Sequence, residues 1–512
     1  MTPDKEDAPT APARWGSRIG RRAFLALATG LAGGGAVSSL QGARRVLDEV
    51  AAPPAAAQSI TERARAVPLA IASVAESQPA TSGTLRIPPL LDARLDGAAR
   101  VFDLALQKGE TELVPGVASA TLGVNGPYLA PTIRAARGDS VLLNVGNQIG
   151  EPTTIHWHGM HLPAAMDGGP HQIVEDGATW SPRFTIRQEA ATLWYHPHLL
   201  GATEAQVGRG LVGMFILDDD TAAQQALPHA YGVDDLPLIL QDIGADGRPI
   251  LGFRRRGPIT TLVNGTVDAT FQTERPLVRL RLLNATSRRF YTLALSEAQP
   301  FHQVGSDGGL LPAPVRMTQL TLGPAERAEI VVDLTEADEV VLRTLGGPGP
   351  ADILTLSSTA TAAAPSLPTA LNEIDRMPAE AAVVTRDMIL TRAPGGFSIN
   401  GQTMRSMADM HDMGSTLHVG MGDVELWNIM NRSGATHMFH VHGLQFQILD
   451  RSSGALAANE IGRKDTVMVR PAETVRIIMR FADFSDASTP YMFHCHILGH
   501  EDGGMMGQFV VV

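Results

Sequence analysis

Four pairs of histidines, each with one residue between its members, restrict the fold of this chain more than any other feature of its sequence. The pairs are His156 and His158, His196 and His198, His440 and His442, and His494 and His496. In a β-strand, residues i and i+2 point to the same face, so each pair can direct two imidazoles to one point. Two pairs lie in the first half of the chain and two lie near its C-terminus. A fold that uses all eight imidazoles at one site must bring these two parts together.

The eight imidazoles favour a polynuclear metal centre. Neutral imidazole is a ligand for Cu, Zn, Fe and Ni. One His-x-His pair is weak evidence, and two such pairs occur in many zinc enzymes. Four pairs can hold about three ions and leave coordination positions open for an exogenous ligand. The alternative is eight separately satisfied core histidines, which requires eight independent coincidences. The pattern therefore predicts a shared metal site.

The only cysteine, Cys495, lies between two of these histidines. A single cysteine excludes a disulfide within the chain, and taken alone it is most often a small buried hydrophobic residue. Strand alternation, however, directs Cys495 to the face opposite His494 and His496. Three further donors belong to the same C-terminal part of the sequence: His437, His500 and Met505.

One thiolate, two imidazoles and a weakly bound thioether form a blue-copper electron-transfer site. The spacing of Cys495, His500 and Met505 predicts donors at a strand end and in the loop that follows it. An electron that reaches copper on one face of the strand can cross through Cys495 to the histidines on the other face. The pattern therefore indicates one-electron oxidation coupled to a cluster that can reduce dioxygen.

Composition and local patterns favour an all-β fold. The chain has 512 residues with 51 Gly and 34 Pro, and turn residues separate short apolar runs such as 141–145, 211–217 and 277–283. This mixture is typical of β-sandwiches or barrels, and the length corresponds to about three domains. We predict domains at 85–222, 228–358 and 383–512, with linkers at 58–84 and 359–382. The middle domain has only His229 and His302, in dissimilar contexts, and is predicted to hold no metal.

Residues 1–57 have the pattern of an export signal. Arg21 and Arg22 precede Phe24-Leu25 and an uncharged run rich in Ala, Gly and Leu, which resembles a twin-arginine signal. Ala55–Ala57 is a small-residue cleavage site, so we expect the segment to be removed. The alternative is an amphipathic or tethering N-terminus. No later segment has 18 or more uninterrupted apolar residues, so we predict no membrane span and a location in the periplasm, at the cell surface or outside the cell.

The formal net charge of −12 argues against nucleic acid as a partner. An acidic surface is compatible with cationic or neutral small substrates, and also with simple solubility. We expect a monomer whose partners are dioxygen and an electron donor, either a small molecule or a metal ion.

These residues resemble the multicopper oxidase family, in particular the bacterial three-domain copper-efflux oxidases and laccase-like enzymes. The similarity covers residues from about 85 to 512 and extends past the metal motifs. It includes the segments 125–127, 131–134, 156–159, 167–170, 281–284, 306–310 and 494–502. The resemblance implies three Greek-key cupredoxin domains, with a copper cluster between the first and the third.

The resemblance also implies four copper ions per chain: one type 1, one type 2 and two type 3. By this resemblance the type 1 ligands are His437, Cys495, His500 and axial Met505. The type 2 ligands are His156 and His440. The type 3 ligands are His158, His196, His198, His442, His494 and His496.

Two carboxylates, Asp167 and Glu501, match positions that supply protons in these relatives. Reduction of dioxygen to two waters consumes four protons with four electrons, and a carboxylate beside a metal cluster can relay a proton through water. The alternative for Asp167 is a turn residue in an Asp-Gly-Gly sequence. The alternative for Glu501 is a solvated loop acid.

The electron donor is less constrained by the sequence. Methionine recurs at every third position, at Met404, Met407, Met410 and Met413. Thioethers suit Cu(I), but the same spacing is typical of one face of a short helix that covers the core. The chain lacks the long Met-rich insertion of many efflux oxidases, and residues 433–436 are Ser-Gly-Ala-Thr where those enzymes have acidic and Met residues. Phenols, aromatic amines and tetrapyrroles such as bilirubin therefore stand beside cuprous ion as alternatives.

Three other classes compete with an oxidase. A copper nitrite reductase has type 1 and type 2 copper but no use for eight imidazoles at one cluster. A non-enzymatic scaffold of the cell envelope predicts missing ligands, and none is missing here. A copper store needs no cysteine between two cluster ligands. The sequence therefore favours a multicopper oxidase of the laccase or cuprous oxidase type.

Overall fold

The computed structural model describes residues 83–512 except 253–256, 336 and 347–348. The predicted export signal at 1–57 and nearly all of the linker at 58–84 lie outside the described residues. Within the described ranges the chain forms six β-sheets, which belong to three successive two-sheet sandwiches. The predicted all-β fold of three sandwiches is confirmed. The α-helices of this part are short, with four to six residues each.

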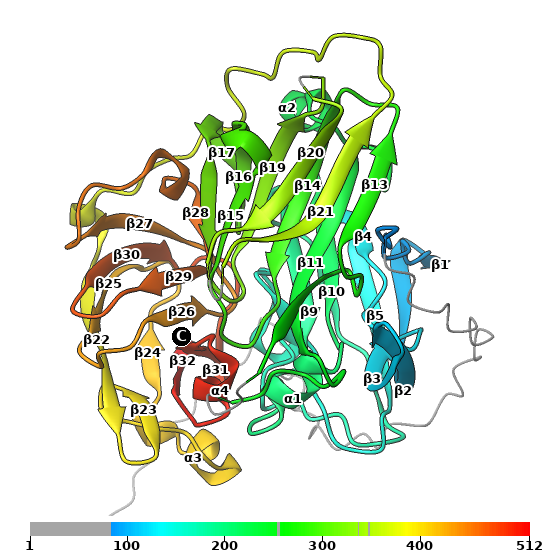
Figure 1. Ribbon diagram of the computed structural model, residues 1–512. Coiled ribbons are helices and arrows are strands. Elements are labelled where there is room, and N and C mark those ends of the chain that lie inside the picture. Colours follow the sequence, from blue (N-terminus) through cyan, green and yellow to red (C-terminus); the bar gives the residue numbers. More distant parts are fainter. Residues whose placement is uncertain (1–82, 253–256, 336, 347–348) are drawn as a thin grey trace, which may run out of the picture. The chain divides into compact units, whose positions relative to one another are not determined.

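The first sandwich contains the strands drawn from blue to green in Figure 1. Its first sheet has the order β1-β2-β5-β7, with β3 on β2 and β8 on β5. These strands are β1 (Arg94–Asp96), β2 (Ala99–Val114), β3 (Val117–Val124), β5 (Ser140–Gln148), β7 (Thr179–Trp180) and β8 (Arg183–Thr185). Its second sheet has the order β4-β10-β9-β6. These strands are β4 (Ile133–Ala136), β10 (Gly213–Asp218), β9 (Ala191–His196) and β6 (His156–His158).

The second sandwich has sheets of six and five strands. The larger has the order β12-β11-β14-β19-β16-β17. These strands are β11 (Asp235–Gly244), β12 (Ile259–Val263), β14 (Leu277–Asn284), β16 (Phe301–Ser306), β17 (Gly309–Met317) and β19 (Arg327–Asp333). The smaller has the order β13-β21-β20-β15-β18. These strands are β13 (Ala269–Thr273), β15 (Tyr291–Leu295), β18 (Gln319–Leu322), β20 (Glu339–Thr344) and β21 (Ala351–Ser358).

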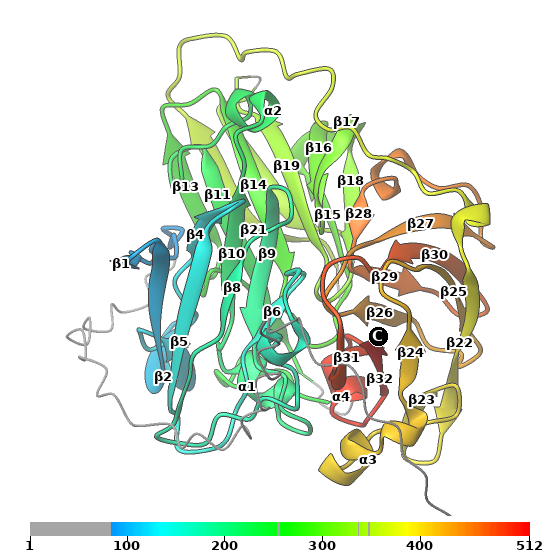
Figure 2. The ribbon, with the colours of Figure 1, turned by 180° about the vertical axis from the view of Figure 1, so that it is seen from behind.

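The third sandwich, drawn from yellow to red in Figure 2, also has sheets of six and five strands. The larger has the order β23-β22-β25-β30-β27-β28. These strands are β22 (Val384–Ala393), β23 (Gly396–Ile399), β25 (Val424–Asn431), β27 (Phe446–Arg451), β28 (Arg463–Lys464) and β30 (Thr474–Arg480). The smaller has the order β24-β32-β31-β26-β29. These strands are β24 (Leu417–Val419), β26 (His437–Val441), β29 (Thr466–Val469), β31 (Asp486–Cys495) and β32 (Met506–Val511).

The second and third sandwiches have the same topology strand for strand. The order β12-β11-β14-β19-β16-β17 recurs as β23-β22-β25-β30-β27-β28, and the smaller sheets correspond in the same way. In all three sandwiches an early strand pairs in parallel with a later one, as β2 with β5, β11 with β14 and β22 with β25. Such a parallel pair cannot be joined by a hairpin, so the chain crosses to other strands in between. The domain boundaries proposed from the sequence stay predictions.

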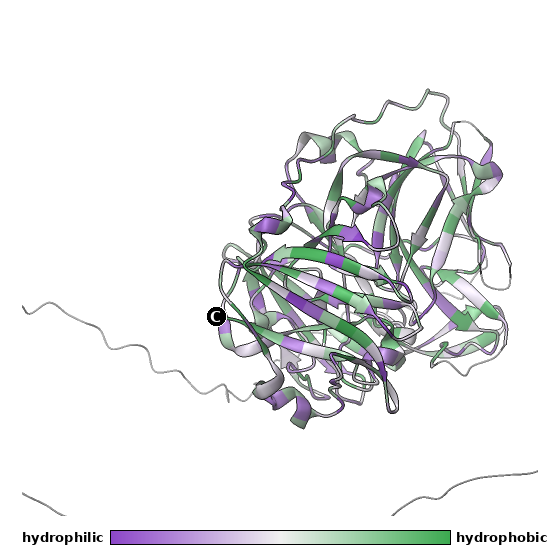
Figure 3. Cartoon of the chain, turned by 90° about the vertical axis from the view of Figure 1, so that its left-hand side faces the viewer, coloured by the Kyte–Doolittle hydropathy of each residue, from purple (hydrophilic) through white to green (hydrophobic). Residues whose placement is uncertain are grey.

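Each sandwich is held together by alternate side chains that point between its two sheets. Trp427 of β25 is fully buried and packs edge-on against Phe493 of β31 in the opposite sheet. In the second sandwich Leu280 of β14 and Leu293 of β15 belong to one buried cluster in the same way. Bands of green and purple along the strands in Figure 3 follow this alternation. Burial of one such large apolar side chain stabilises the fold by about 1.5–3 kcal/mol.

The helices lie in the connections between strands. They are α1 (Thr203–Gly208), α2 (Ala222–Ala226), α3 (Met407–His411) and α4 (Leu498–Glu501). Helix α3 begins with a capping box, in which the Ser406 side chain accepts from the Asp409 amide and the Asp409 side chain accepts from the Ser406 amide. Among the helices of the described ranges, none is long and apolar enough to cross a membrane.

A buried polar network joins the first sandwich to the second. Arg281 of β14 donates to both oxygens of Asp235, at 2.6 and 2.9 Å, and to Thr192 of β9 at 2.7 Å. Thr192 in turn donates to Glu329 of β19 at 2.6 Å, and Arg279 also donates to Glu329. Burial raises the pKa of Glu329, but Arg279 and Arg281 more than offset this effect and lower the pKa to about 2. Glu329 is therefore ionised and fully paired.

Replacement of Glu329 by Gln should leave two buried guanidinium groups with less negative charge beside them. We expect a loss of about 3–5 kcal/mol of stability near neutral pH. Because the pKa is lowered by folding, the stabilisation is present above the ordinary pKa of 4.5 and is lost as the pH falls towards 2. Thermal and denaturant unfolding across this pH range measure the effect.

The matched control is Asp352→Asn, which removes an exposed partner of Arg343 and should change stability by less than about 1 kcal/mol. Equal stability of Glu329→Gln and the parent protein at neutral pH would contradict the expectation.

Candidate metal centre

The first sandwich directs four histidines to one place. Strands β6 and β9 pair antiparallel, with His156 opposite His196. His158 lies beside His196, with Nδ1 and Nε2 of the two rings 3.3 Å apart. His198 follows two residues after His196, and its amide donates to Thr154 at 2.7 Å. The pair His156 and His158 thus lies within a strand, as its spacing predicts, whereas His198 lies just past the end of β9.

The third sandwich contributes the other four histidines of the four pairs. Strands β26 and β31 pair antiparallel, with His440 opposite His494. The amide of His442 donates to the Met492 carbonyl at 3.0 Å, which continues the ladder past the end of β26. His496, just past the end of β31, donates its amide to the Met438 carbonyl of β26.

The eight rings converge from the two sandwiches. His156 stacks on His442 and His158 stacks on His440, in both cases with ring centroids 3.8 Å apart. Nε2 of His198 and Nε2 of His494 lie 3.1 Å apart. Every one of the eight side chains is at most 1 % exposed. The two distant parts of the chain thus meet at one buried imidazole cluster, as the sequence predicts.

Several ring nitrogens of this cluster have no hydrogen-bond partner among the described residues. They are Nε2 of His156, Nε2 of His440 and both ring nitrogens of His496. A buried polar atom without a partner is costly and rare in a folded protein. Imidazole nitrogens turned towards one another in a water-free space are donors for metal ions, so the residues present fit a metal cluster.

Burial favours the neutral form of seven of the cluster imidazoles. Burial, and then the neighbouring imidazoles, lower the pKa of these rings well below the usual range. The rings affected in this way are His158, His196, His198, His440, His442, His494 and His496. A neutral imidazole has a lone pair available for a metal, so the fold keeps these side chains in the state that binds.

Two acids, Asp167 and Asp465, each contact one histidine of the first sandwich and one of the third. Asp167 of the first sandwich accepts from His156 of the same sandwich through its backbone carbonyl, at 2.9 Å. Its carboxylate lies 2.7 Å from Nδ1 of His442 in the third sandwich. Asp465 of the third sandwich accepts from His440 through its carbonyl at 2.7 Å. Its carboxylate lies 3.1 Å from Nε2 of His158 in the first.

Each acid therefore orients one ring of its own sandwich and one ring of the other. A hydrogen bond to one ring nitrogen fixes the tautomer and leaves the second nitrogen as a lone-pair donor. The turn that ends η1 (Ala164–Met166) positions Asp167, and β29 begins directly after Asp465.

A separate group of donors surrounds the cysteine. The Cys495 sulfur lies 3.4 Å from Nδ1 of His437 and 3.4 Å from Nδ1 of His500. Met505 is fully buried in the same core cluster as Cys495, and its carbonyl accepts from the Cys495 amide at 3.0 Å. The structure thus brings together the four residues that the sequence singled out for one site. Ser433 lies 2.6 Å from the other ring nitrogen of His437.

Burial shifts the protonation of this group. It lowers the pKa of His437 to about 4 and, together with His437, the pKa of His500 to about 3. Burial also raises the pKa of the Cys495 thiol to about 12. Both imidazoles are therefore ready to bind a metal, while the thiol must lose its proton when a metal binds.

Glu501 lies buried beside the imidazole cluster. Its two oxygens lie 3.4 Å from Nδ1 of His198 and 3.3 Å from Nδ1 of His494. Burial, and then the neighbouring Asp502, raise the pKa of Glu501 well above its usual range. Glu501 is 1 % exposed, which is a different environment from a solvated loop acid.

The methionine stretch does not present its sulfurs on one exposed face. Met404 and Met410 are buried together with Met492 and Met506 in a small apolar cluster, against which Met407 packs. Met413 is 37 % exposed. The observed placement favours the alternative in which α3 and its flanks cover the core.

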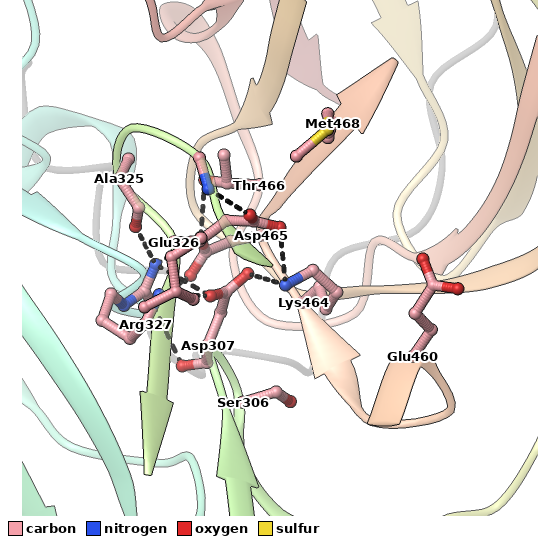
Figure 4. A network of polar contacts seen from close by, with 12 residues as sticks. Ser306, Asp307, Ala325, Glu326, Arg327, Glu460, Lys464, Asp465, Thr466 and Met468 are labelled. Atoms are coloured by element: carbon pink, nitrogen blue, oxygen red, sulfur yellow. Dashed lines mark hydrogen bonds and ion pairs between the residues drawn. The ribbon is translucent and has the colours of Figure 1, made fainter. Parts of the chain in front are cut away.

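Asp465 and the arginine that pairs with it are not among the residues that the sequence predicts for the site. Figure 4 shows Arg327 of β19 pointing at Asp465, to which it donates two hydrogen bonds of 2.7 and 2.5 Å. Arg327 also donates to the Thr192 carbonyl of β9 at 3.0 Å. Lys464 pairs with Asp307 at 2.8 Å in the same network. The one signal in the sequence is an acid directly before the β-prone run 466–469.

The middle sandwich, which contributes no ring to the cluster, thus takes part in the centre. Arg327 is fully buried and contacts residues of all three sandwiches. Its charge holds the Asp465 carboxylate in place, and that carboxylate contacts His158.

Comparison with known proteins agrees with this geometry. Two family profiles described as multicopper oxidase match residues 105–222 and 384–512. A multicopper oxidase from Staphylococcus aureus is 34 % identical over 83 % of this chain and 92 % of its own length. The cell division protein FtsP of Escherichia coli is 34 % identical over 89 % of this chain and 97 % of its own length.

Among solved structures, the laccase-like multicopper oxidase CueO of the lignin-degrading bacterium Ochrobactrum sp. superposes with a TM-score of 0.77. It is 32 % identical, and the match covers 84 % of this chain and all of that one. The chain belongs to the multicopper oxidase family. The family resemblance drawn from the sequence is confirmed, and membership implies copper and an oxidoreductase activity.

Replacement of Asp465 by Asn should weaken copper binding. The amide keeps the shape of the side chain but no longer balances Arg327 or orients His158 by charge. Loss of such an outer contact typically lowers metal affinity roughly 10–100-fold. Copper retained per chain after dialysis against chelators of graded strength measures the effect.

The control is Asp450→Asn, which removes a half-exposed partner of Arg476 in the same sandwich. Copper retention by Asp465→Asn equal to that of the control would contradict a role for Asp465 in the centre.

Proposed function

We propose that this protein couples four one-electron oxidations of a reducing substrate to the reduction of dioxygen to two waters. The substrate is oxidised at a type 1 copper, and dioxygen is reduced at a trinuclear cluster. Family membership supports the general reaction. The copper types and the substrate are parts of the proposal.

The proposed ligands follow the two groups of donors described above. For type 1 copper they are His437, Cys495, His500 and Met505. For type 2 copper they are His156 and His440. For the type 3 pair they are His158, His196, His198, His442, His494 and His496. When bound, the copper ions supply the redox chemistry, and the protein holds the donors and excludes water.

One observation carries this proposal: Cys495 contacts two histidines on one side of β31 while its chain neighbours belong to the other group. Its sulfur lies 3.4 Å from His437 and His500. His494 and His496, one residue away on either side, belong to the buried imidazole cluster. A short covalent path thus links an electron-accepting group to a cluster, which a copper store does not need.

The two acids have separate parts in the proposal. Glu501 is buried against His198 and His494, and burial favours the protonated form of its carboxyl group, so it can supply protons as dioxygen is reduced. Asp167 is the second proposed proton relay, and its contacts with His156 and His442 also make it an orienting residue.

The proposed substrates are laccase-like, namely phenols and aromatic amines. A pocket of about 800 Å³ opens beside His500, which gives an organic donor access to the type 1 group. The Ochrobactrum relative is described as active towards lignin model compounds and lignosulfonate. Cuprous ion and bilirubin-type tetrapyrroles are the alternatives, and buried Met404 and Met410 weaken the cuprous one.

A non-enzymatic role is the second candidate, because the cell division protein FtsP is among the relatives. The complete set of donors in this chain weighs against that role. We further propose export by the twin-arginine-type signal to the periplasm, the cell surface or the medium. The monomeric state stays a prediction.

Metal analysis tests the proposal directly. The holoenzyme should contain about four copper ions per chain and show an intense blue absorption from thiolate coordination. Cys495→Ser should abolish the blue absorption and turnover, because the sulfur is removed, while most of the remaining copper is retained. His302→Gln, in the middle sandwich, is the control and should retain all copper. A parent protein that contains no copper, or only one copper ion per chain, would contradict the oxidase function and favour the other classes of protein.

Glu501→Gln tests the proton supply. The variant should load copper normally, and its reduced form should react with dioxygen about 100-fold more slowly, the usual contribution of a positioned acid. Stopped-flow mixing of the reduced enzyme with oxygen measures the rate. Glu110→Gln, an exposed position, is the control. A variant with full copper and unchanged reoxidation would rule out the relay through Glu501.

A further inference from the structure

The pocket beside His500 is formed mainly by the second and third sandwiches. Residues 285–290, between β14 and β15, line one side. Arg392 of β22, Phe397 of β23 and the α4 residue His500 line the other. The Ser287 carbonyl accepts from the Leu498 amide at 2.9 Å, so this loop of the second sandwich contacts the helix that carries His500. Any donor of electrons to His500 from this side must fit between the two sandwiches.

The lining of the pocket carries a net positive charge. Three arginines belong to it, at positions 288, 289 and 392, and the single acid among the lining residues described is Asp242. Asp242 accepts from Arg289 at 3.0 Å and from the Tyr291 hydroxyl at 2.6 Å. The count of two excess positive charges contrasts with the net charge of −12 of the whole chain. A local field of this sign attracts anions and repels cations.

The same pocket has an aromatic floor next to the type 1 group. The Phe397 ring packs against the His500 ring, with centroids 4.3 Å apart, and against the His437 ring at 4.8 Å. The Arg392 guanidinium lies over Phe397, 5.4 Å from the ring centroid. Phe290 and Ile497 add further apolar surface. A planar ring can therefore stack beside His500 with an arginine close to its edge.

The lining offers little to a cuprous ion. Among the lining residues that the structure describes there is no methionine and no cysteine, and the one carboxylate is engaged by Arg289 and Tyr291. Cu(I) prefers thioether and thiolate donors. The positive field adds a further penalty for any cation that approaches His500 through this pocket.

We propose that the electron donor at this pocket is an aromatic anion, a phenol that carries a carboxylate. The ring stacks near Phe397 and His500, and the carboxylate pairs with Arg288 and Arg392. This inference rests on the proposed oxidase function and adds the substrate class. Each phenol loses one electron to the type 1 site and one proton to solvent, leaving a phenoxyl radical. Four such losses supply the four electrons, and with four protons one dioxygen becomes two waters.

A matched substrate pair tests the inference. 3-(4-Hydroxy-3-methoxyphenyl)propionate and its primary amide share the oxidisable ring and differ in charge. With the copper-loaded full-length enzyme at low ionic strength, kcat/KM from oxygen uptake should be about ten-fold higher for the carboxylate. The ratio should decrease as salt is raised to about 0.5 M, because screening weakens attraction between exposed charges.

Arginine variants connect the preference to the pocket. Arg288→Gln and Arg392→Gln should each lower the carboxylate-to-amide ratio several-fold, mainly through KM of the carboxylate. Arg316→Gln, an exposed arginine outside this pocket, is the matched control and should keep the parent ratio. Copper content and the blue absorption, measured for each variant, distinguish loss of the preference from loss of the metal site.

The possible results distinguish failure of the proposed substrate class from failure of the proposed oxidase function. Equal kcat/KM values for the carboxylate and the amide would overturn the proposal that the substrate is an anion. A carboxylate-to-amide ratio that neither arginine variant changes would overturn it as well. Both results would leave the proposed oxidase function intact. Cu(I) oxidised more efficiently than both phenols also overturns the anionic substrate. Copper-loaded protein that takes up no oxygen with any of the three donors overturns the oxidase function, and the substrate class with it.

Discussion

The buried ion pair between Arg327 and Asp465 is the interaction on which the rest of the centre depends. Both side chains are completely inaccessible to water, where an isolated charge would be very costly. Their pairing lets a carboxylate reach His158 while the Asp465 carbonyl holds His440. Since Arg327 comes from the middle sandwich, the part of the chain without ligands has a direct effect on the geometry of the ligands. The cluster histidines come from the first and third sandwiches, but residues of all three sandwiches are needed to orient their rings.

Much of the centre could be predicted from the sequence because strand geometry is local. A His-x-His pair in a strand must present two rings on one side, and Cys495 between such residues must point the other way. Asp465 and Arg327 could not be predicted in this way, because their partners lie 307 and 138 positions away. The three Greek-key domains are implied by the family resemblance, whereas the strand-for-strand match of the second and third sandwiches is visible only in the structure. Corresponding strands such as β15 and β26 share their pairing but not their side chains, Tyr291–Leu295 against His437–Val441.

The centre and the pocket use charge in opposite ways. Around the imidazoles, burial and mutual repulsion remove positive charge and leave lone pairs, and acids hold the rings from outside. On the far side of Cys495, arginines line an open pocket in an otherwise acidic protein. The group of His437, Cys495 and His500 connects the two environments, because His500 lines the pocket and Cys495 is the chain neighbour of His494 and His496.

The distance along the chain between the paired histidines has a consequence for assembly. His198 and His494 are 296 positions apart, and the last strand, β32, pairs with β31 directly beside His494. A growing polypeptide therefore has no complete cluster until residues 494–496 have been made and have paired with β26. A metal ion held by both His198 and His494 would tie the first and third sandwiches together, much as a cross-link over a long loop does.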